Sequence, residues 1–362
     1  MGWFTRPVQM VDDQARLQPQ IEAWVDRSNL EEVVFHDVTG EFLRVMSRAA
    51  AMRVPAVARA RHLTVGAVAQ APLQALRLGT PVTPQPYWMY GTDGQLGDLS
   101  LADCQRLGLT AQSPHARMLW TVDDLIFYGM SLWYATRFDA PDPAGNTRMS
   151  RGVRVPWDYW DFQDHAFVDA DGHPLDQARC VLIPGPHEGI LRFGERTVRI
   201  AADLEQTAAD VAQRPFRLEL HQTTDTTLTP TERQELIAQT RVALAANDGI
   251  LFTNSAVETK DHLLTSEQLL IGARNGSAVD VARLVSTPAA LIDAATEGTS
   301  MDYTNLDHRN QLWLDFGLSF YMDPITARLG MDDVLPAGQR AAFDTSNLTA
   351  TTTAATGYPT ED

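Results

Sequence analysis

The stretch TPAALIDAATEGTSMDYTNLDHRNQLWLDFGLSFYMDPITARL, residues 287–329, decides the fold. It begins with a proline turn and a short run of small residues, and a glycine-containing loop at residues 293–302 follows. That loop carries Asp293, Glu297 and Asp302 and no basic residue. The remainder has the spacing of large apolar residues that is typical of a helix. The stretch therefore predicts an acidic loop followed by a long helix.

The predicted helix covers residues 303–329. Trp313, Phe316 and Phe320 are spaced by three and four residues, which places them on one bulky apolar face. Pro324 has no N–H and collides with the preceding turn, so we expect a kink or break just before it. On pattern alone, an ordinary core helix with a surface loop explains these features equally well.

The composition is that of a soluble globular protein, with 362 residues, 44% hydrophobic residues and a mean hydropathy of -0.20. The net charge of -17 argues against a surface that grips phosphates over its whole area. No run of apolar residues is long enough to cross a membrane, and the N-terminus lacks the pattern of a secretion signal. We therefore expect no membrane partner and a protein that stays inside the cell that makes it.

The first half of the chain predicts helices and then short strands. Two helical pieces, residues 41–54 and 56–76, are separated by Pro55, and their arginines form a basic face that is either solvated or paired within an oligomer. A further helix begins at Ser113 as N-cap with proline next to it. Residues 151–183 read as short strands, with a turn at Asp171-Gly172.

The second half predicts helix, strand, helix, strand and helix. The helices are expected at 194–213, at 230–247 after a capping box of Thr229 and Glu232, and at 264–285 with an interruption at Asn275-Gly276. The strands are expected at 215–222 and 250–254. After residue 348 the composition predicts a disordered, low-complexity tail.

Motifs for chemistry are few. The sequence has no phosphate-binding loop of the P-loop or dinucleotide type, no nucleophile elbow and no zinc-ligand cluster. Cys104 and Cys180 are far apart, and we expect both to be buried thiols. The carboxylates between Asp158 and Asp171, with His165, have the residue types of an Mg²⁺ or Ca²⁺ site, and the alternative is a set of solvent-facing turns. These observations predict no catalytic residue, no metal and no cofactor. The other function left open is a metal-dependent hydrolase that uses this acidic cluster.

The order of elements resembles that of the portal proteins of tailed bacteriophages, the siphophage-type head-to-tail connectors. The resemblance covers roughly residues 53–348. It rests on AVARARHLTVGAVAQAPLQAL at 56–76, WTVDDLIFYGMSLWYA at 120–135, VLIPGPHEGIL at 181–191, the helix–insert–helix order that follows, and the quoted stretch at 287–329. One departure is Leu182 before Ile183-Pro184, where the family has a histidine.

The resemblance implies an α+β, mainly α fold with a wing, a stem and a clip, a small or absent crown, and a ring oligomer. Residues 1–192 would be the N-terminal part of the wing. The stem would consist of the helices at 193–213 and 261–286, with the clip at 214–260 between them. Residues 287–335 would be the tunnel loop and the long wing helix, and residues 336–362 a short C-terminal segment with a disordered tail.

The implied function is a ring, a dodecamer, at one capsid vertex of the virion, assembled in the host cytoplasm. Double-stranded DNA would be packaged and ejected through it. The implied partners are the terminase large subunit, the major capsid protein and a head–tail adaptor. The implied tunnel-loop residues are Asp293, Thr296, Glu297, Thr299 and Asp302. On the second stem helix, Arg274 and Arg283 are candidates to face DNA, and the alternative is that they form salt bridges between subunits.

Overall fold

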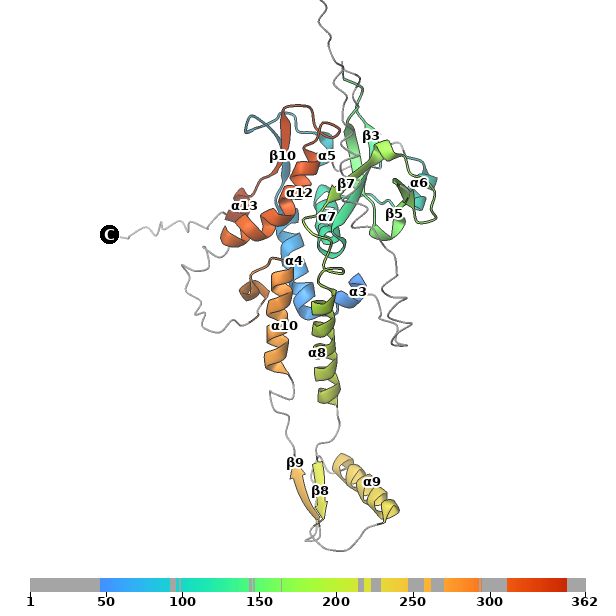
Figure 1. Ribbon diagram of the computed structural model, residues 1–362, viewed down its shortest axis with the longest axis vertical. Coiled ribbons are helices and arrows are strands. Elements are labelled where there is room, and N and C mark those ends of the chain that lie inside the picture. The colour runs from blue at the N-terminus through green and yellow to red at the C-terminus, as the bar shows by residue number, and fades with distance from the viewer. Residues whose placement is uncertain are drawn as a thin grey trace, which may run out of the picture. The chain divides into compact units, whose positions relative to one another are not determined.

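The computed structural model describes residues 46–91, 96–97, 99–142, 145, 147–163, 165–213, 218–222, 229–246, 257–261, 270–292, 294 and 311–349. The chain divides into two compact units (Figure 1). The larger unit comprises residues 1–202 and 275–362, and the smaller unit comprises residues 203–274.

The larger unit contains helices and short strands in nearly alternating order. Its helices are α3 (Arg48–Ala51), α4 (Pro55–Gln70), α5 (Tyr87–Tyr90), α6 (Leu101–Arg106), α7 (Pro114–Tyr128), the 3-10 helices η1 (Trp157–Tyr159), η2 (Gln177–Arg179) and η3 (Ala289–Ile292), the π-helical η4 (Trp313–Leu318), α12 (Ser319–Leu329) and α13 (Ser346–Thr349). Its strands are β1 (Leu73–Arg77), β2 (Thr80–Pro81), β3 (Met130–Phe138), β4 (Met149–Arg154), β5 (Trp160–Gln163), β6 (Ala166–Asp169), β7 (Cys180–Pro184) and β10 (Gln339–Phe343).

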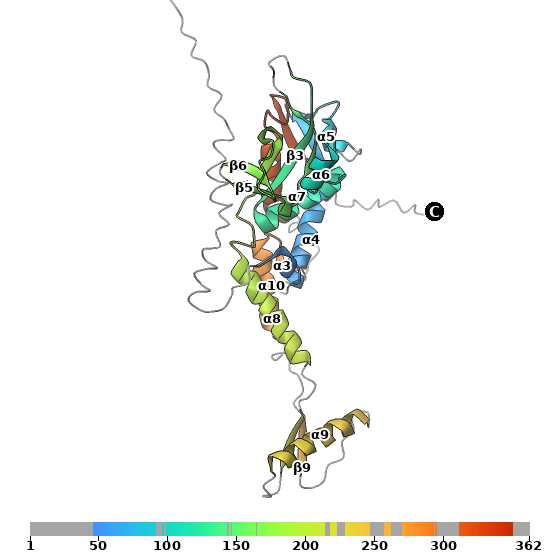
Figure 2. The same ribbon diagram turned by 90° about the vertical axis from the view of Figure 1, so that its right-hand side faces the viewer.

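The strands form three small antiparallel sheets. In the central sheet, β3 lies between β4 and β7, and Trp133 is opposite Arg154 on one side and Val181 on the other. A second sheet has the order β10-β1-β2. In it, β1 pairs with β2, its hairpin partner, on one side and with β10, which comes from near the end of the chain, on the other. The third is the β5–β6 hairpin. Helix α7 lies beside β3 in both ribbon views (Figures 1 and 2).

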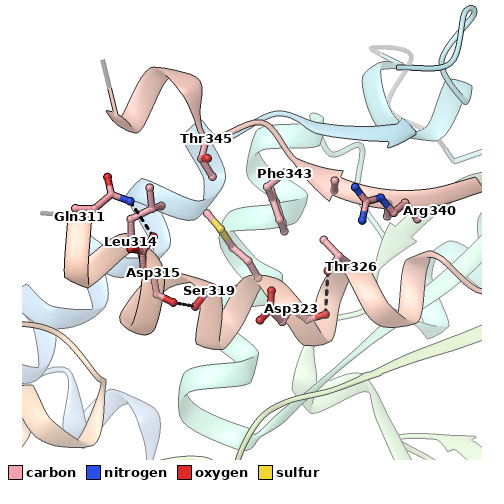
Figure 3. A pocket seen from close by; sticks show the side chains of 12 residues that line it. Gln311, Leu314, Asp315, Ser319, Asp323, Thr326, Arg340, Phe343 and Thr345 are labelled. Atoms are coloured by element: carbon pink, nitrogen blue, oxygen red, sulfur yellow. Dashed lines mark hydrogen bonds between the residues drawn. The ribbon is translucent and has the colours of Figure 1, made fainter. Parts of the chain in front are cut away.

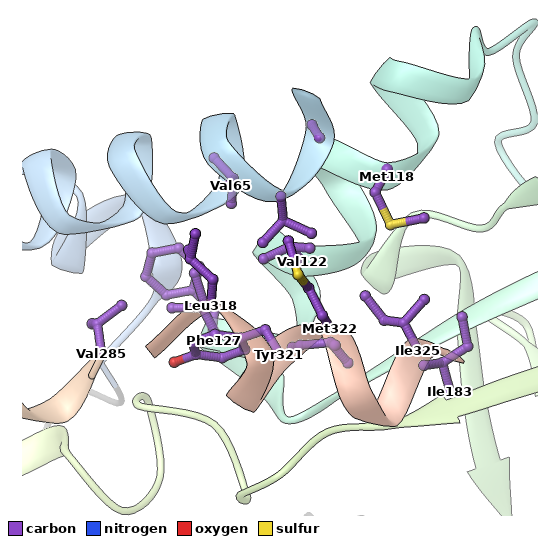
Figure 4. Packing of buried hydrophobic residues seen from close by; sticks show 14 of the residues in the cluster. Val65, Met118, Val122, Phe127, Ile183, Val285, Leu318, Tyr321, Met322 and Ile325 are labelled. Carbon is purple, nitrogen blue, oxygen red and sulfur yellow. The ribbon is translucent and has the colours of Figure 1, made fainter. Parts of the chain in front are cut away.

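The main core lies between α4, α7, α12 and the central sheet. Val65 from α4, Val122 from α7 and Tyr321 from α12 are at most 1% exposed. Figure 4 shows these side chains meeting, with Ile183 of β7 closing the cluster beside Ile325. Three helices from distant parts of the sequence therefore bury their apolar faces against one sheet, which is the dominant stabilising contribution in such a fold.

Buried ion pairs hold α3 and α4 to α7, and α7 to β4. The Asp123 carboxylate accepts hydrogen bonds from Arg48 at 2.7 and 3.0 Å and from Arg61 at 2.5 Å. Asp124 pairs with the Arg154 guanidinium and accepts a bond of 2.7 Å from the Ser131 hydroxyl. Both aspartates are 1% exposed, so these bonds replace part of the hydration that the carboxylates lose on folding, and burial still raises the pKa of Asp124 to about 6 despite its bonds to Arg154 and Ser131.

Gly129 ends α7 and makes the sharp connection into β3. Its φ is 77°, and its N–H donates to the carbonyls of Asp124 and Leu125. A Cβ at this position would collide with the carbonyl oxygen of His187. Glycine is therefore required here by both the left-handed backbone and the close approach of the 187–189 loop.

Helices α8 (Glu195–Gln213) and α10 (Ile271–Leu284) begin in one unit and end in the other. In the larger unit, Val198 and Ala201 of α8 and Val281 and Ala282 of α10 belong to the same buried cluster. The smaller unit contains the rest of α8, the antiparallel pair of β8 (Leu218–Gln222) and β9 (Val257–Asp261), the helix α9 (Pro230–Ala246) between these strands in the chain, and the start of α10. It includes the part of the chain expected to be the clip.

Several sequence-based expectations are confirmed. The Ser113 hydroxyl accepts a bond from Ala116 N at the start of α7, with Pro114 at its first position. Glu232 bonds back to Thr229 N at 2.8 Å, and Glu232 N donates to the Thr229 hydroxyl at 3.4 Å, which is the capping box that the sequence predicts for α9. The mixed helix-and-sheet fold is also as expected.

The long helix differs from its prediction in two ways. It is not broken near residue 323, because α12 continues through Pro324 to Leu329. Its buried face is also not the expected one: Phe316 and Phe320 are 72% and 37% exposed, whereas the residues that pack into the core are Leu318, Tyr321, Met322, Ile325 and Leu329. With about 3.6 residues per turn, these five residues share one side of the helix, and Phe316 and Phe320 lie on the opposite side, so the prediction chose the wrong one of two apolar faces.

Two other boundaries were wrong. Residues 73–76 were expected to be helical, but Pro72 is followed by β1, whose pairing with β10 outweighs the local helical pattern. The helix α10 runs through Asn275-Gly276 without interruption. The strand β10 and the helix α13 had no counterpart in the prediction, which assigned no element to residues 336–348. The predicted strand at 250–254, and the predicted tail from residue 350 onward, lie outside the described residues.

No helix among the described residues is both long enough and apolar enough to span a membrane.

Candidate functional site

The acidic segment predicted to line a channel is reached from η3. The residues Asp293, Thr296, Glu297, Thr299 and Asp302 themselves lie outside the described residues. Before the segment, the Thr287 hydroxyl lies 3.0 Å from the Thr64 hydroxyl of α4, and Thr287 N donates to Ala282 O at 2.9 Å. Ile292 and Ala294 are 7% and 5% exposed. The segment therefore starts from a buried, hydrogen-bonded anchor.

The segment ends at a second anchor, which lies next to the first. A Cβ built on Gly317 would lie 2.5 Å from Ser286 O, so the backbone of η4 touches the backbone just after α10. Leu318, the last residue of η4, is buried in the main core. The chain before residue 287 and the chain after residue 311 are thus held side by side. An acidic segment between them is attached to the rigid core at both ends.

The two arginines predicted on the second stem helix have different surroundings. Arg274 donates to both carboxylate oxygens of Glu205 on α8, at 3.0 and 2.7 Å. Such a fork of two bonds fixes the guanidinium in orientation as well as in charge. Arg274 therefore links α8 to α10 inside one chain, which is a role the sequence did not reveal.

Arg283 is much more accessible. Its side chain is 75% exposed, and its bond of 2.7 Å goes to Asp280 one turn earlier on the same helix. An exposed pair of this kind contributes only about 0.5 kcal/mol, so the guanidinium can exchange Asp280 for another anion at small cost. Of the two candidates, Arg283 is the one whose charge is available to a ligand such as a phosphate.

The acidic cluster of the hydrolase hypothesis lies around the β5–β6 hairpin and forms hydrogen bonds within it. Asp161 accepts hydrogen bonds from Phe162 N and the Gln163 amide, both close in sequence. Asp158 lies in η1, His165 in the β5–β6 turn, and Asp164 lies outside the described residues. In the described chain, the one group of three metal-ligand side chains that gathers within 4.8 Å is Asp169, Asp171 and His173.

Asp169 itself has both carboxylate oxygens in use. One accepts the backbone N–H groups of Asp171 at 3.0 Å and His173 at 2.8 Å, and the other accepts from Arg106 at 3.2 Å. Burial raises the pKa of Asp169, but the backbone N–H bonds and the nearby charges outweigh it and hold the pKa below its usual value. The Asp169 carboxylate thus stabilises the turn through its backbone N–H groups and pairs with Arg106. A metal ion bound to Asp169 would have to displace these donors.

Sequence reasoning missed one concave feature, a pocket between α12 and β10. It has a volume of about 500 Å³ and is lined by both elements and by η4 (Figure 3). Two carboxylates, Asp315 and Asp323, lie on the helical side, and Arg340 lies on the strand side. No signal in the sequence pointed to this pocket, because β10 was not predicted.

Comparison with known proteins identifies this architecture. No protein-family model and no curated protein matches the chain. Among solved structures, an HK97-family phage portal protein from Corynebacterium diphtheriae is similar, with 31% identity and a TM-score of 0.57. That match covers 84% of this chain and 98% of the other.

Two more distant structures share the fold. One comes from the neck of a native gene transfer agent particle, computed with C12 symmetry, with 13% identity, a TM-score of 0.55 and coverage of 83% of both chains. The other comes from the neck of an empty particle of this kind, computed with C6 symmetry, with 14% identity, a TM-score of 0.54 and coverage of 86% of this chain and 88% of the other. All three are portal or particle proteins rather than enzymes.

The fold is therefore that of a portal protein. The chain belongs to the HK97 family of phage portal proteins. The sequence-based recognition is confirmed.

Proposed function

We propose that this chain forms the ring at one vertex of a phage capsid through which double-stranded DNA is packaged and ejected. The observation that carries the proposal is the match to an HK97-family portal protein along 98% of that protein's length. The likeness to the neck of a gene transfer agent particle computed with C12 symmetry supports a ring of twelve copies in a virion. The proposed role is mechanical, with no catalytic residue, metal or cofactor.

In this proposal the predicted parts of the chain have separate tasks. Residues 1–192 and 287–335 form the wing, which contacts the major capsid protein. The helices at 193–213 and 261–286 form the stem, and residues 214–260 form the clip, which docks the terminase large subunit and later a head–tail adaptor. Residues 203–274 form a compact unit of their own, with α9 and an antiparallel strand pair, and this supports a separate docking part. Residues 336–362 follow the wing, with a small or absent crown.

The acidic segment is proposed to face the DNA in the channel. Asp293, Glu297 and Asp302 repel phosphates, and Thr296 and Thr299 add no positive charge, so DNA slides without being gripped. The two neighbouring anchors at Thr287 and Gly317 support such a tunnel loop, because they hold its ends on the core. Arg283 is proposed as the exposed stem cation that meets the DNA backbone, with Arg274 bracing the stem helices.

The test replaces Asp293, Glu297 and Asp302 together with Lys. The expected result is normal rings, seen by negative-stain electron microscopy, with less DNA packaged per capsid. A matched control makes the same change of net charge at Asp139, Asp171 and Asp332, which are exposed positions in the larger unit. Normal packaging by the first variant would remove the loop from the mechanism.

A further inference from the structure

The β1–β2 hairpin ends in a fully exposed leucine. Arg77 pairs with Thr80, so Leu78 and Gly79 form a two-residue turn, and their φ angles are 52° and 84°. Two positive φ angles are what a tight hairpin turn of this length requires. The Leu78 side chain is 99% exposed, the highest value among the exposed large apolar residues of the described chain.

Leucine is unfavourable at this position for two separate reasons. In the left-handed region a Cβ approaches the carbonyl oxygen, so Asn, Asp or Gly is favoured there. A large apolar side chain in full contact with water also gains nothing from the hydrophobic effect. Neither the turn nor the solvent accounts for leucine, whereas a surface that buries Leu78 would account for it.

The pocket between α12 and β10 has the chemistry to bury such a side chain. Its lining includes the apolar side chains of Leu314, Met322 and Phe343 and the carboxylates of Asp315 and Asp323 (Figure 3). Arg340 lowers this negative charge but does not cancel it, because it is one cation against two carboxylates. The strand β10 is one of the two outer strands of its three-stranded sheet, so it pairs with a neighbouring strand of that sheet along one edge only.

The residue next to Leu78 has the complementary charge. Arg77 is exposed, and within the described part of the chain its guanidinium makes no hydrogen bond or ion pair. The Asp323 carboxylate is also exposed and has no such bond to a described residue. An apolar tip beside a cation on one surface thus matches a pocket on another surface of the same chain that combines apolar side chains with two carboxylates.

We propose that the Arg77-Leu78 tip of one copy inserts into the α12–β10 pocket of the adjacent copy. This inference rests on the proposed ring. A head-to-tail contact needs two unlike surfaces on each subunit, and repetition of that contact closes a ring. In this contact Leu78 packs against Leu314, Met322 and Phe343, and Arg77 pairs with the carboxylates of Asp315 and Asp323.

The first test compares Leu78→Asn with Leu101→Asn in the full-length chain. Leu101 is a matched control because it is also exposed, at 75%, but lies at the start of a helix. Ring formation is followed by mass photometry as the protein is diluted, and unfolding of the subunit is followed by urea titration. Leu78→Asn should raise the concentration needed for assembly by about 10- to 100-fold, the equivalent of one buried leucine per contact. Its resistance to urea should be equal or higher, because Asn tolerates the left-handed turn.

The second test reverses the charges. Arg77→Asp should weaken assembly, and the added change Asp323→Arg should restore it, because the two charges would again be opposite across the contact. Restoration identifies the pocket as the site that receives the tip.

The outcomes separate the two proposals. If the wild-type chain forms rings and Leu78→Asn assembles at the same concentration, the tip-and-pocket contact is overturned and the ring proposal stays intact. The same conclusion follows if Asp323→Arg does not restore the assembly of Arg77→Asp. A wild-type chain that stays monomeric would overturn both.

Discussion

Replacing Asp123 with Asn should be among the most destabilising single changes in the larger unit. The carboxylate is 1% exposed and accepts three hydrogen bonds from two arginines, which come from α3 and α4. The amide of Asn carries no charge and replaces one of the two acceptor oxygens with a donor. Arg61, which is 8% exposed, is then left with a buried charge that is no longer compensated.

The expected cost follows from these contacts. Breaking a buried ion pair by removing one partner costs about 3 to 5 kcal/mol, chiefly because the remaining charge stays out of water. Arg48 is less affected, since 27% of its side chain is exposed and water can hydrate it. We expect the free energy of unfolding of the Asp123→Asn variant to fall by about 3 to 5 kcal/mol.

The measurement is equilibrium unfolding in urea at neutral pH, at a subunit concentration below that of assembly. Tryptophan fluorescence reports on the core through the buried Trp88 and Trp133. Asp323→Asn is the matched control, because that carboxylate is exposed, and it should change stability by no more than about 0.5 kcal/mol. Adding Arg61→Met to Asp123→Asn should recover part of the loss, because no buried guanidinium then remains at that position.

An Asp123→Asn variant as stable as Asp323→Asn would refute this reasoning. A double variant that loses the full sum of both single losses would also contradict it, because the two residues would then act independently.

Two further predictions concern the connection between α7 and the 187–189 loop. Gly129→Ala should lower the free energy of unfolding by more than about 2 kcal/mol, because of the positive φ and the collision with His187 O. Gly66→Ala, which has open space around it on α4, should raise that free energy by about 0.5 to 1 kcal/mol. Thermal unfolding of both variants checks that the two changes have opposite signs. Burial lowers the pKa of His187 to about 4, and its Nδ1 already accepts a bond from Gly189 N, so the unfolded chain takes up the proton first. Stability should therefore be lost as the pH falls from 6.5 to about 4, by about 3 kcal/mol, and His187→Gln should remove this part of the urea-measured pH profile; an unchanged profile would contradict the assignment.

The sequence carried the local signals of the fold well. The caps at Ser113 and Thr229 were predicted because a hydroxyl followed by proline and, for Thr229, by Glu232 satisfies the free N–H groups of a helix start. The order of elements was sufficient to recognise a portal protein. These features depend on residues that are close in the chain.

The misassigned features depend on distant partners. Residues 73–76 are a strand because β10, far along the chain, pairs with them. The long helix has two apolar faces, and its packing against α4, α7 and the central sheet decides that Tyr321 and Ile325 are buried whereas Phe316 is exposed. The partner of Arg274 on α8 and the pocket beside β10 could not be predicted for the same reason.

The most direct measurement of the central claim is a negative-stain electron micrograph of the purified full-length chain. We expect rings of about twelve subunits with a hole along the axis. If the protein were still monomeric at high concentration, or formed closed particles without an axial hole, a portal role for this protein would be contradicted.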